Sequence, residues 1–274
     1  MAINLQRVEE LLSQDVTLHR ISDSELIGQV LPTLATLNSD LRQQVVTLLT
    51  RFAHHDRITP ARKQSIMLAL IDDDYLFYNM GKQASEDVYK RSYSMAVLSE
   101  LLAAHEMVPF LTDDAYDEIY RAVLLYIQLE EDVRSYGKEG GRLQPVAHAV
   151  DALEHLLHDE RFHPEDTAKI FRMLANKIAC HQVLYLGDEQ EVLSKMIVQL
   201  LKISLDEKVI EDFFVRVPKF IAAQTAKVTS EQQMYLHKNI TSFLYVFHTF
   251  IYRKNTHHTL LKSIDHCLLK LQKI

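Results

Sequence analysis

The sequence predicts an all-α fold, and three observations support this prediction. The 274 residues include only 6 Gly and 6 Pro, whereas average usage would give roughly 19 and 14. A β-sandwich or barrel needs a turn about every 8–12 residues, so this chain has too few turn residues for either. It also has no Gly-rich first loop of the kind that a doubly wound α/β fold uses. Apolar residues recur at i, i+3, i+4 and i+7 in nearly every segment, which is the period of an α-helix.

Capping residues mark where the expected helices begin. Ser22 and Glu25 have the spacing of a capping box, and Thr229 and Gln232 repeat that spacing near the other end of the chain. Thr59 precedes a proline, which is tolerated at the first position of a helix. In chain order, these and similar signals predict roughly eleven helices, of which the clearest cover residues 26–30, 41–52, 88–104, 115–131, 167–181, 192–203, 234–253 and 260–271.

The connections between these helices are short, and short connections place neighbouring helices antiparallel. We therefore expect an irregular α/α superhelix of antiparallel helical hairpins, with a compact multi-helix bundle as the alternative. A single helical domain is expected over residues 1–274, with room for a soft division at the Gly-rich loop 136–142. That loop contains Gly137, Gly140 and Gly141. It is the one connection rich in glycine, whereas the other connections are short.

Polar residues flank the Gly-rich loop at regular positions. Asp132, Arg134 and Tyr136 precede it, and Gly141, Ala147, His148 and Asp151 follow it. This arrangement resembles a family of uncharacterised bacterial helical proteins with a domain of unknown function, whose pattern is Asp-x-Arg-Gly-Tyr, a loop, and Gly-Trp-x-His-x-x-Ala-His-x-x-Asp. The upstream run Arg91-Ser92-Tyr93-Ser94 is similar to another element of that family. The resemblance implies a helical fold and a candidate surface, and it implies no activity.

The chain departs from that pattern at three positions. Ser135 replaces the glycine, Arg142 stands at the tryptophan position, and Gln144 stands at the first histidine. A His-x-x-x-His pair on a helix is a metal-ligand geometry, but here the pair is Gln144 and His148. Because an amide oxygen is a poor ligand for zinc-like ions, we expect no metal site and no cofactor.

On a helix, the residues Gln144, His148, Asp151 and His155 fall in one stripe, opposite an apolar face. This stripe is either the solvated side of an amphipathic helix or the lining of a groove that faces Arg134. For the second case, the candidate ligand-binding residues are Arg91, Asp132, Arg134, Tyr136, Gln144, His148 and Asp151.

Three functions fit these residues. The first is a helical-repeat-like binding or scaffold protein, with a concave polar groove that binds a small molecule or a protein. The second is a metal-independent enzyme in which His148 acts as acid or base, Asp151 orients it and Arg134 holds an anionic small molecule. The third is binding of nucleic acid or an acidic partner through residues 234–274, which carry six Lys or Arg and one Asp. A pI near 6.0 makes nucleic acid the less favoured partner.

The cellular location expected from the sequence is the cytoplasm. The N-terminal residues lack the basic start and apolar run of a secretory signal. The longest apolar stretch, 243–252, is interrupted by His248 and is shorter than the roughly 20 residues that span a membrane. Cys180 and Cys267 lie far apart, without metal-ligand spacing, as buried thiols in a reducing compartment would. We therefore expect no membrane partner.

Overall fold

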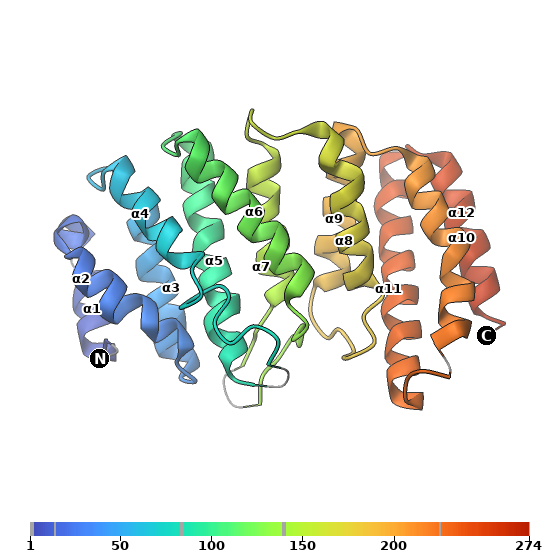
Figure 1. Cartoon of the computed structure of the whole chain (residues 1–274), viewed down its shortest axis with the longest axis horizontal. Coiled ribbons are helices and arrows are strands. Elements are labelled where there is room, and N and C mark those ends of the chain that lie inside the picture. The colour runs from blue at the N-terminus through green and yellow to red at the C-terminus, as the bar shows by residue number, and fades with distance from the viewer. Residues whose placement is uncertain (1–2, 14, 83–84, 139–140, 225, 274) are drawn as a thin grey trace. The chain divides into compact units, whose positions relative to one another are not determined.

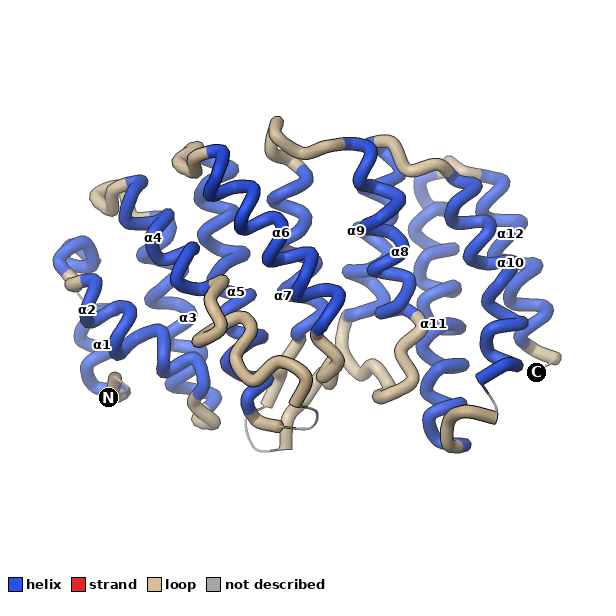
Figure 2. The backbone as a smooth tube through the Cα atoms, viewed as in Figure 1, coloured by secondary structure: helices blue, strands red, loops and turns tan. Residues whose placement is uncertain are grey.

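The computed structural model describes residues 3–13, 15–82, 85–138, 141–224 and 226–273. Within these ranges the chain folds into helices and forms no β-strand (Figures 1 and 2). A single isolated bridge between Tyr136 and Arg142 is the one β-type pairing among the described residues. The structure is 73% helical, so the predicted all-α class is confirmed.

The helices follow one another through short connections and a few longer loops. The first part of the chain is irregular, because the short α2 continues into a π-helical turn, Leu26–Val30, and a 3₁₀ turn, Leu31–Ala35. In chain order the α-helices are α1 (Leu5–Ser13), α2 (Asp23–Glu25), α3 (Ser39–His54), α4 (Pro60–Leu70), α5 (Asp87–Met107), α6 (Asp113–Leu129), α7 (Pro145–Leu157), α8 (Thr167–Ile178), α9 (Glu189–Ile203), α10 (Glu207–Gln224), α11 (Ser230–Lys254) and α12 (His258–Leu271).

Two predicted caps, at Ser22 and Thr229, are confirmed, whereas Thr59 precedes α4 without a side-chain capping hydrogen bond. The Ser22 hydroxyl accepts a hydrogen bond from the Glu25 amide at 3.1 Å, and Thr229 with Gln232 forms a complete capping box at the start of α11. The cap of α3 is Asn38, whose side chain accepts from the Leu41 amide at 3.0 Å. The start of α12 also differs: Asn255 and His257 both adopt positive φ, so the connection from α11 is a tight left-handed turn.

The chain forms two compact units, Met1–Phe162 and His163–Ile274. The Gly-rich loop 136–142 lies inside the first unit, and its Gly140 falls outside the described residues. The prediction of a single domain with a soft division at this loop therefore stays a prediction, as does the superhelical arrangement.

In the first unit, α5 is the central helix. It packs between α3 and α7, and these three form one layer against which α4 and α6 lie (Figure 1). Fourteen of its 21 residues are buried, and they are distributed around the whole helix, as in a helix covered on all sides. The N-terminal half of α5 carries the Arg91-Ser92-Tyr93 run, so these polar residues lie in the interior of the unit.

In the second unit, α9 and α11 pack against each other most extensively, and α12 packs against both α10 and α11. The core contains a row of phenylalanines, with Phe214, Phe243 and Phe247 almost completely buried. Ring contacts continue this row from Phe247 to Phe214 and on to Phe213. A closely packed aromatic core thus lies between the helices, and α8 covers one side of it.

Candidate functional site

The segment from 130 to 144, between α6 and α7, begins with a buried ion pair. The Arg91 Nε and Nη2 atoms donate to the two carboxylate oxygens of Glu130 at 2.6 and 2.9 Å, and both side chains are shielded from solvent. Arg91 Nη1 donates to the Tyr78 carbonyl at 3.0 Å. Burial by itself lowers the pKa of Arg91, but the bidentate contact with Glu130 raises it above its usual value. Arg91 is therefore a charged anchor inside the first unit.

The same carboxylate continues into a second ion pair. The Glu130 Oε1 atom accepts from the Asp132 amide at 3.0 Å. The buried Asp132 carboxylate in turn accepts from Arg134 Nε and Nη2 at 2.7 and 2.8 Å. Arg134 Nη2 also donates to the Ser85 carbonyl at 2.9 Å. The hydrogen bonds that Arg134 donates to the Asp132 carboxylate hold the pKa of Arg134 above its usual value. Three predicted ligand-binding residues, Arg91, Asp132 and Arg134, are thus brought together as a chain of structural contacts.

The second half of the segment is a small hairpin. Gly137 donates its amide to the Gly141 carbonyl at 2.9 Å, and Leu143 donates to the Ser135 carbonyl at 3.0 Å. Gly141 has φ +78°, and a Cβ at Gly137 would lie 2.1 Å from the Tyr89 hydroxyl. The glycines are therefore required by a left-handed turn at one position and by a close approach to α5 at the other.

Two tyrosines of α5 donate hydrogen bonds to the backbone of this hairpin. The Tyr89 and Tyr93 hydroxyls donate to the carbonyls of Gly141 and Arg142 at 3.2 and 2.9 Å. The guanidinium of Arg42, itself buried, lies 4.2 Å from the Tyr89 ring centre and 4.5 Å from that of Tyr93. Sequence reasoning missed Arg42 and Tyr89, because neither lies near the loop in the sequence.

His148 belongs to the same set of contacts. Its Nδ1 atom lies 3.0 Å from both the Oγ and the carbonyl oxygen of Ser92. The Ser92 hydroxyl donates its proton to the Leu143 carbonyl, so both Ser92 oxygens accept from His148, whose Nδ1 atom therefore carries a proton. His148 thereby fixes the start of α7 against α5.

The remaining predicted residues lie at the surface or outside α7. Gln144 is the residue before the helix, with φ +53°, so it does not belong to the stripe in which the sequence placed it. The reason is Pro145, which disfavours helical geometry in the residue that precedes it. Tyr136 is 47% exposed, and Asp151 is exposed on α7. Arg134 is directed to Asp132 and Ser85 in the structure, so its guanidinium is used within the loop.

A second polar cluster lies at the C-terminal ends of α5 and α7. His105 Nδ1 accepts from the amides of Phe110 and Leu111 at 2.7 and 3.2 Å, and its Nε2 lies 3.1 Å from Asp159. Burial lowers the pKa of His105. Burial raises the pKa of Asp159, but the bidentate Arg161 guanidinium outweighs it and lowers that pKa to about 2. These contacts fix the turn after α5.

Glu106 contacts His155 of α7 and His158, the residue that follows α7, beside that cluster. Its carboxylate lies 2.6 Å from His155 Nδ1 and 3.0 Å from His158 Nδ1. His155 is the last residue of the predicted polar stripe, and it is used in this contact. Over the described ranges, no group of three or more His, Cys, Asp or Glu side chains is arranged to hold a metal ion.

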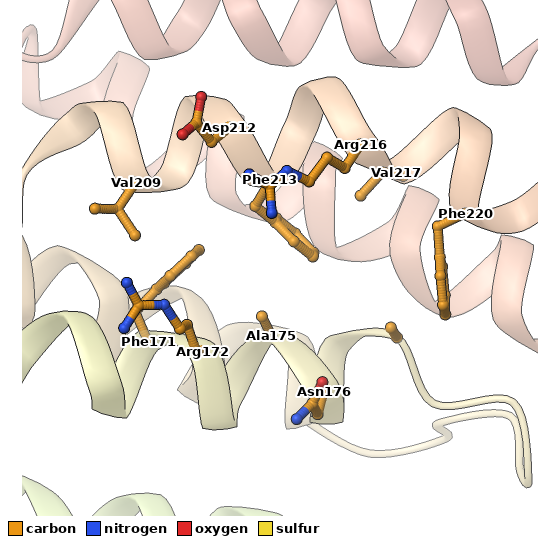
Figure 3. A pocket seen from close by; sticks show the side chains of 11 residues that line it. Phe171, Arg172, Ala175, Asn176, Val209, Asp212, Phe213, Arg216, Val217 and Phe220 are labelled. Atoms are coloured by element: carbon orange, nitrogen blue, oxygen red, sulfur yellow. The ribbon is translucent and has the colours of Figure 1, made fainter.

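The second unit contains a cavity of about 380 Å³ between α8 and α10 (Figure 3). Phe171 and Ala175 line it from α8, and Phe213, Val217 and Phe220 line it from α10. Arg172 and Arg216 also line it, one from each helix. The sequence alone did not indicate this cavity, because aromatic residues at helical spacing are normally core residues.

A smaller cavity of about 290 Å³ lies between α10 and α12. Lys262, His266 and Lys270 line it at four-residue spacing along α12, so they share one face of the helix. This is the part of the basic segment 234–274 that the structure gathers into a continuous stripe. Binding of an acidic partner or nucleic acid by this segment stays a prediction.

Residues 76–249 match the family described as "Protein of unknown function (DUF2785)". The chain belongs to this family. The matched range contains the loop, its anchor on α5 and the α8–α10 cavity, so all three lie within the DUF2785 domain. The detailed motif and the bacterial origin expected from the sequence stay predictions.

Neither the curated proteins nor the solved structures contain a significant match to the chain. In the described part of the chain, no helix is both long and apolar enough to cross a membrane.

Proposed function

We propose that this DUF2785 chain is a cytoplasmic binding or scaffold module that presents the two described arms of the hairpin, 135–138 and 141–143, as a preorganised recognition surface. The observation that carries the proposal is the buried anchor, which runs from Arg91 through Glu130 and Asp132 to Arg134. Loops longer than about 12–15 residues are uncommon in compact domains and are often functional. Buried ion pairs contribute little net stability, and their best-attested use is to specify one conformation. Here they specify the conformation of the loop.

The anchored loop exposes side chains that suit a partner surface. Tyr136, Lys138 and Arg142 are exposed on the hairpin, while the atoms that hold the backbone lie beneath it on α5. Tyrosine and arginine are enriched among residues that dominate binding energies, because they combine a large contact area with polar groups. A preorganised loop also loses less conformational entropy on binding than a mobile one. The expected partner is a protein or small molecule with acidic and apolar groups.

The enzyme alternative has less support from the contacts. An acid–base histidine needs room for a substrate and a group that holds the substrate. Arg134, the proposed substrate anchor, makes a bidentate contact with Asp132. His148 directs its Nδ1 atom to Ser92. These residues are engaged in positioning the loop, which favours a binding function. The cytoplasmic location is supported by Cys180 and Cys267, both buried free thiols.

Site-specific photo-cross-linking in cells tests this proposal. Tyr136 is replaced by a photoreactive phenylalanine analogue, and the exposed Tyr245 of α11 receives the same replacement as a control. We expect a discrete cross-linked product from position 136 and none of that size from position 245. The product should disappear when Arg142→Glu is added. Failure to obtain a product at 136, or the same product at both positions, would contradict the proposal.

A further inference from the structure

The cavity between α8 and α10 is an elongated trough. Its lining residues recur along both helices at helical spacing, from Phe171 to Ala179 on α8 and from Val209 to Phe220 on α10. Figure 3 shows the two helices side by side and running in the same direction. The twelve residues from Val209 to Phe220, at a rise of about 1.5 Å per residue, give a trough about 16 Å long, or three helical turns.

The floor of the trough is apolar and partly open to solvent. The Phe171 and Phe213 rings meet edge to face, with their centres 5.8 Å apart, and Phe220 remains 40% exposed. Phe213 is half-buried, although the adjacent Phe214 is completely buried in the core. Contiguous apolar surface that remains accessible, and that polar residues border, is typical of interaction sites.

The border of the trough carries two arginines that the fold does not use. Arg172 and Arg216 are exposed, and throughout the described ranges neither makes a hydrogen bond or an ion pair. In Figure 3 the Arg172 guanidinium lies between the two helices and the Arg216 side chain runs along α10, whereas the Asp212 carboxylate points away from α8. The groups that border the trough are therefore mainly cationic and are directed toward an occupant.

We propose that this trough binds an amphipathic α-helix of a partner protein that carries acidic residues beside its apolar face. An apolar groove about three turns long accommodates the i, i+3, i+4 and i+7 side chains of a docked helix. Its floor supplies aromatic anchors, and Arg172 and Arg216 supply charge complementarity to Asp or Glu on the partner. The trough lies in the second unit and shares no residue with the hairpin 135–143, so this site is additional to the proposed function.

A designed helical peptide tests the proposal with the full-length chain. The probe is an 18-residue fluorescent peptide with Leu and Phe along one face and Glu at the flanking positions. Its counterpart has Lys in place of every Glu. In fluorescence anisotropy titrations we expect saturable binding of the acidic peptide and at least tenfold weaker binding of the basic one.

Charge reversal in the trough should invert this preference. The double variant Arg172→Glu/Arg216→Glu should bind the basic peptide better than the acidic one. Lys195 and Lys238 are exposed residues of the same unit outside the trough, so Lys195→Glu/Lys238→Glu makes the same change in net charge and should leave the preference unaltered. Phe220→Ser should weaken binding of the acidic peptide at least tenfold while the far-ultraviolet dichroism spectrum stays unchanged.

Other outcomes would overturn the proposal. Equal affinity for the two peptides, or loss of the preference in the lysine control, would show that the trough does not select an acidic helix. If anilinonaphthalene sulfonate, an aromatic anion, binds in an arginine-dependent way while the peptide does not, the occupant is a small molecule. If the chain self-associates, and the arginine double variant abolishes the association, the occupant is a second copy of the chain.

Discussion

The two units use arginine in opposite ways. In the first unit, Arg91 and Arg134 donate bidentate hydrogen bonds to carboxylates, and Arg91 is completely buried. In the second unit, Arg172 and Arg216 are exposed beside an apolar trough, and within the described residues no partner accepts from them. The buried arginines position a loop, whereas the exposed ones remain free to meet a ligand.

This difference shows why residue type alone does not identify a binding site. A buried charge must be paired, because removal from water costs several kcal/mol. Pairing then occupies the donor groups that a ligand would need. An exposed arginine keeps its donors in water and can exchange that water for an acidic ligand. At Arg91, Asp132 and Arg134, which belong to the pattern that resembles a family motif, the side chains make contacts within the fold, whereas the arginines that border the trough belong to no motif.

Breaking the buried pair should have the largest effect on stability. Glu130→Gln keeps the shape of the side chain but leaves the buried Arg91 charge without its carboxylate. We expect a loss of about 3–5 kcal/mol in the free energy of unfolding, measured by urea denaturation followed by circular dichroism. Asp117→Asn, which breaks the exposed Asp117–Arg121 pair, should cost no more than about 0.5 kcal/mol. Similar losses in the two variants would contradict the anchoring role.

A side chain added at Gly137, between the hairpin and α5, should have the next largest effect on the free energy of unfolding. A Cβ at Gly137 would overlap the Tyr89 side chain, and that ring is fixed between Arg42 and the hairpin. We expect Gly137→Ala to lower the free energy of unfolding by about 1–3 kcal/mol and to speed amide hydrogen exchange at Leu143. Gly28→Ala is the matched control, because no atom lies within 4 Å of the added Cβ. A neutral effect at Gly137 would mean that the hairpin shifts freely on α5.

The Asp159–Arg161 ion pair should make a pH-dependent contribution to the free energy of unfolding. The pKa of Asp159 is lowered to about 2, below the unfolded value near 3.9. Its contribution is therefore fully present above the unfolded pKa and is lost as pH falls from about 5 to 2. We expect the difference in unfolding free energy between the wild type and Asp159→Asn to shrink by about 1–2 kcal/mol over this window, after allowance for solvent screening. If the difference measured by parallel urea titrations does not change with pH, the charge of the Asp159 carboxylate does not stabilise the fold.

The smallest effect on stability should come from the trough. Arg172→Ala and Arg216→Ala remove exposed side chains that make no ion pair with a carboxylate among the described residues. We expect each to change the unfolding free energy by no more than about 0.5 kcal/mol. A loss above about 1 kcal/mol in urea denaturation for either variant would show that its guanidinium is structural. The contrast with the arginines of the first unit would then disappear.

Local sequence features were sufficient for much of the fold. The capping signals at Ser22 and Thr229 correspond to observed caps, because such a cap involves side chains and amides only two or three residues apart. The start of α12 was harder to place, since the left-handed residues Asn255 and His257 carry no glycine to signal the turn. The π and 3₁₀ turns after α2 likewise have no distinct sequence period.

The candidate site could be predicted only in part. Sequence reasoning selected Arg91, Asp132 and Arg134, and the structure brings these residues together. It did not identify Glu130, the carboxylate that joins them, because Glu130 fell inside the helix expected over 115–131. Arg91 and Glu130 are 39 residues apart, so their pairing follows from the packing of α5 beside the end of α6. Whether these candidate residues bind a ligand stays a prediction.

The sequence by itself determined that this chain is helical, because scarce glycine and proline, helical apolar spacing and capping residues all act locally. Only the tertiary structure decided which charges are buried in pairs and which remain at the surface. The physical reason is that the state of an arginine depends on its distance from carboxylates and on its exclusion from water. Both are set by how helices pack, as the contrast between Arg91 and Arg216 shows.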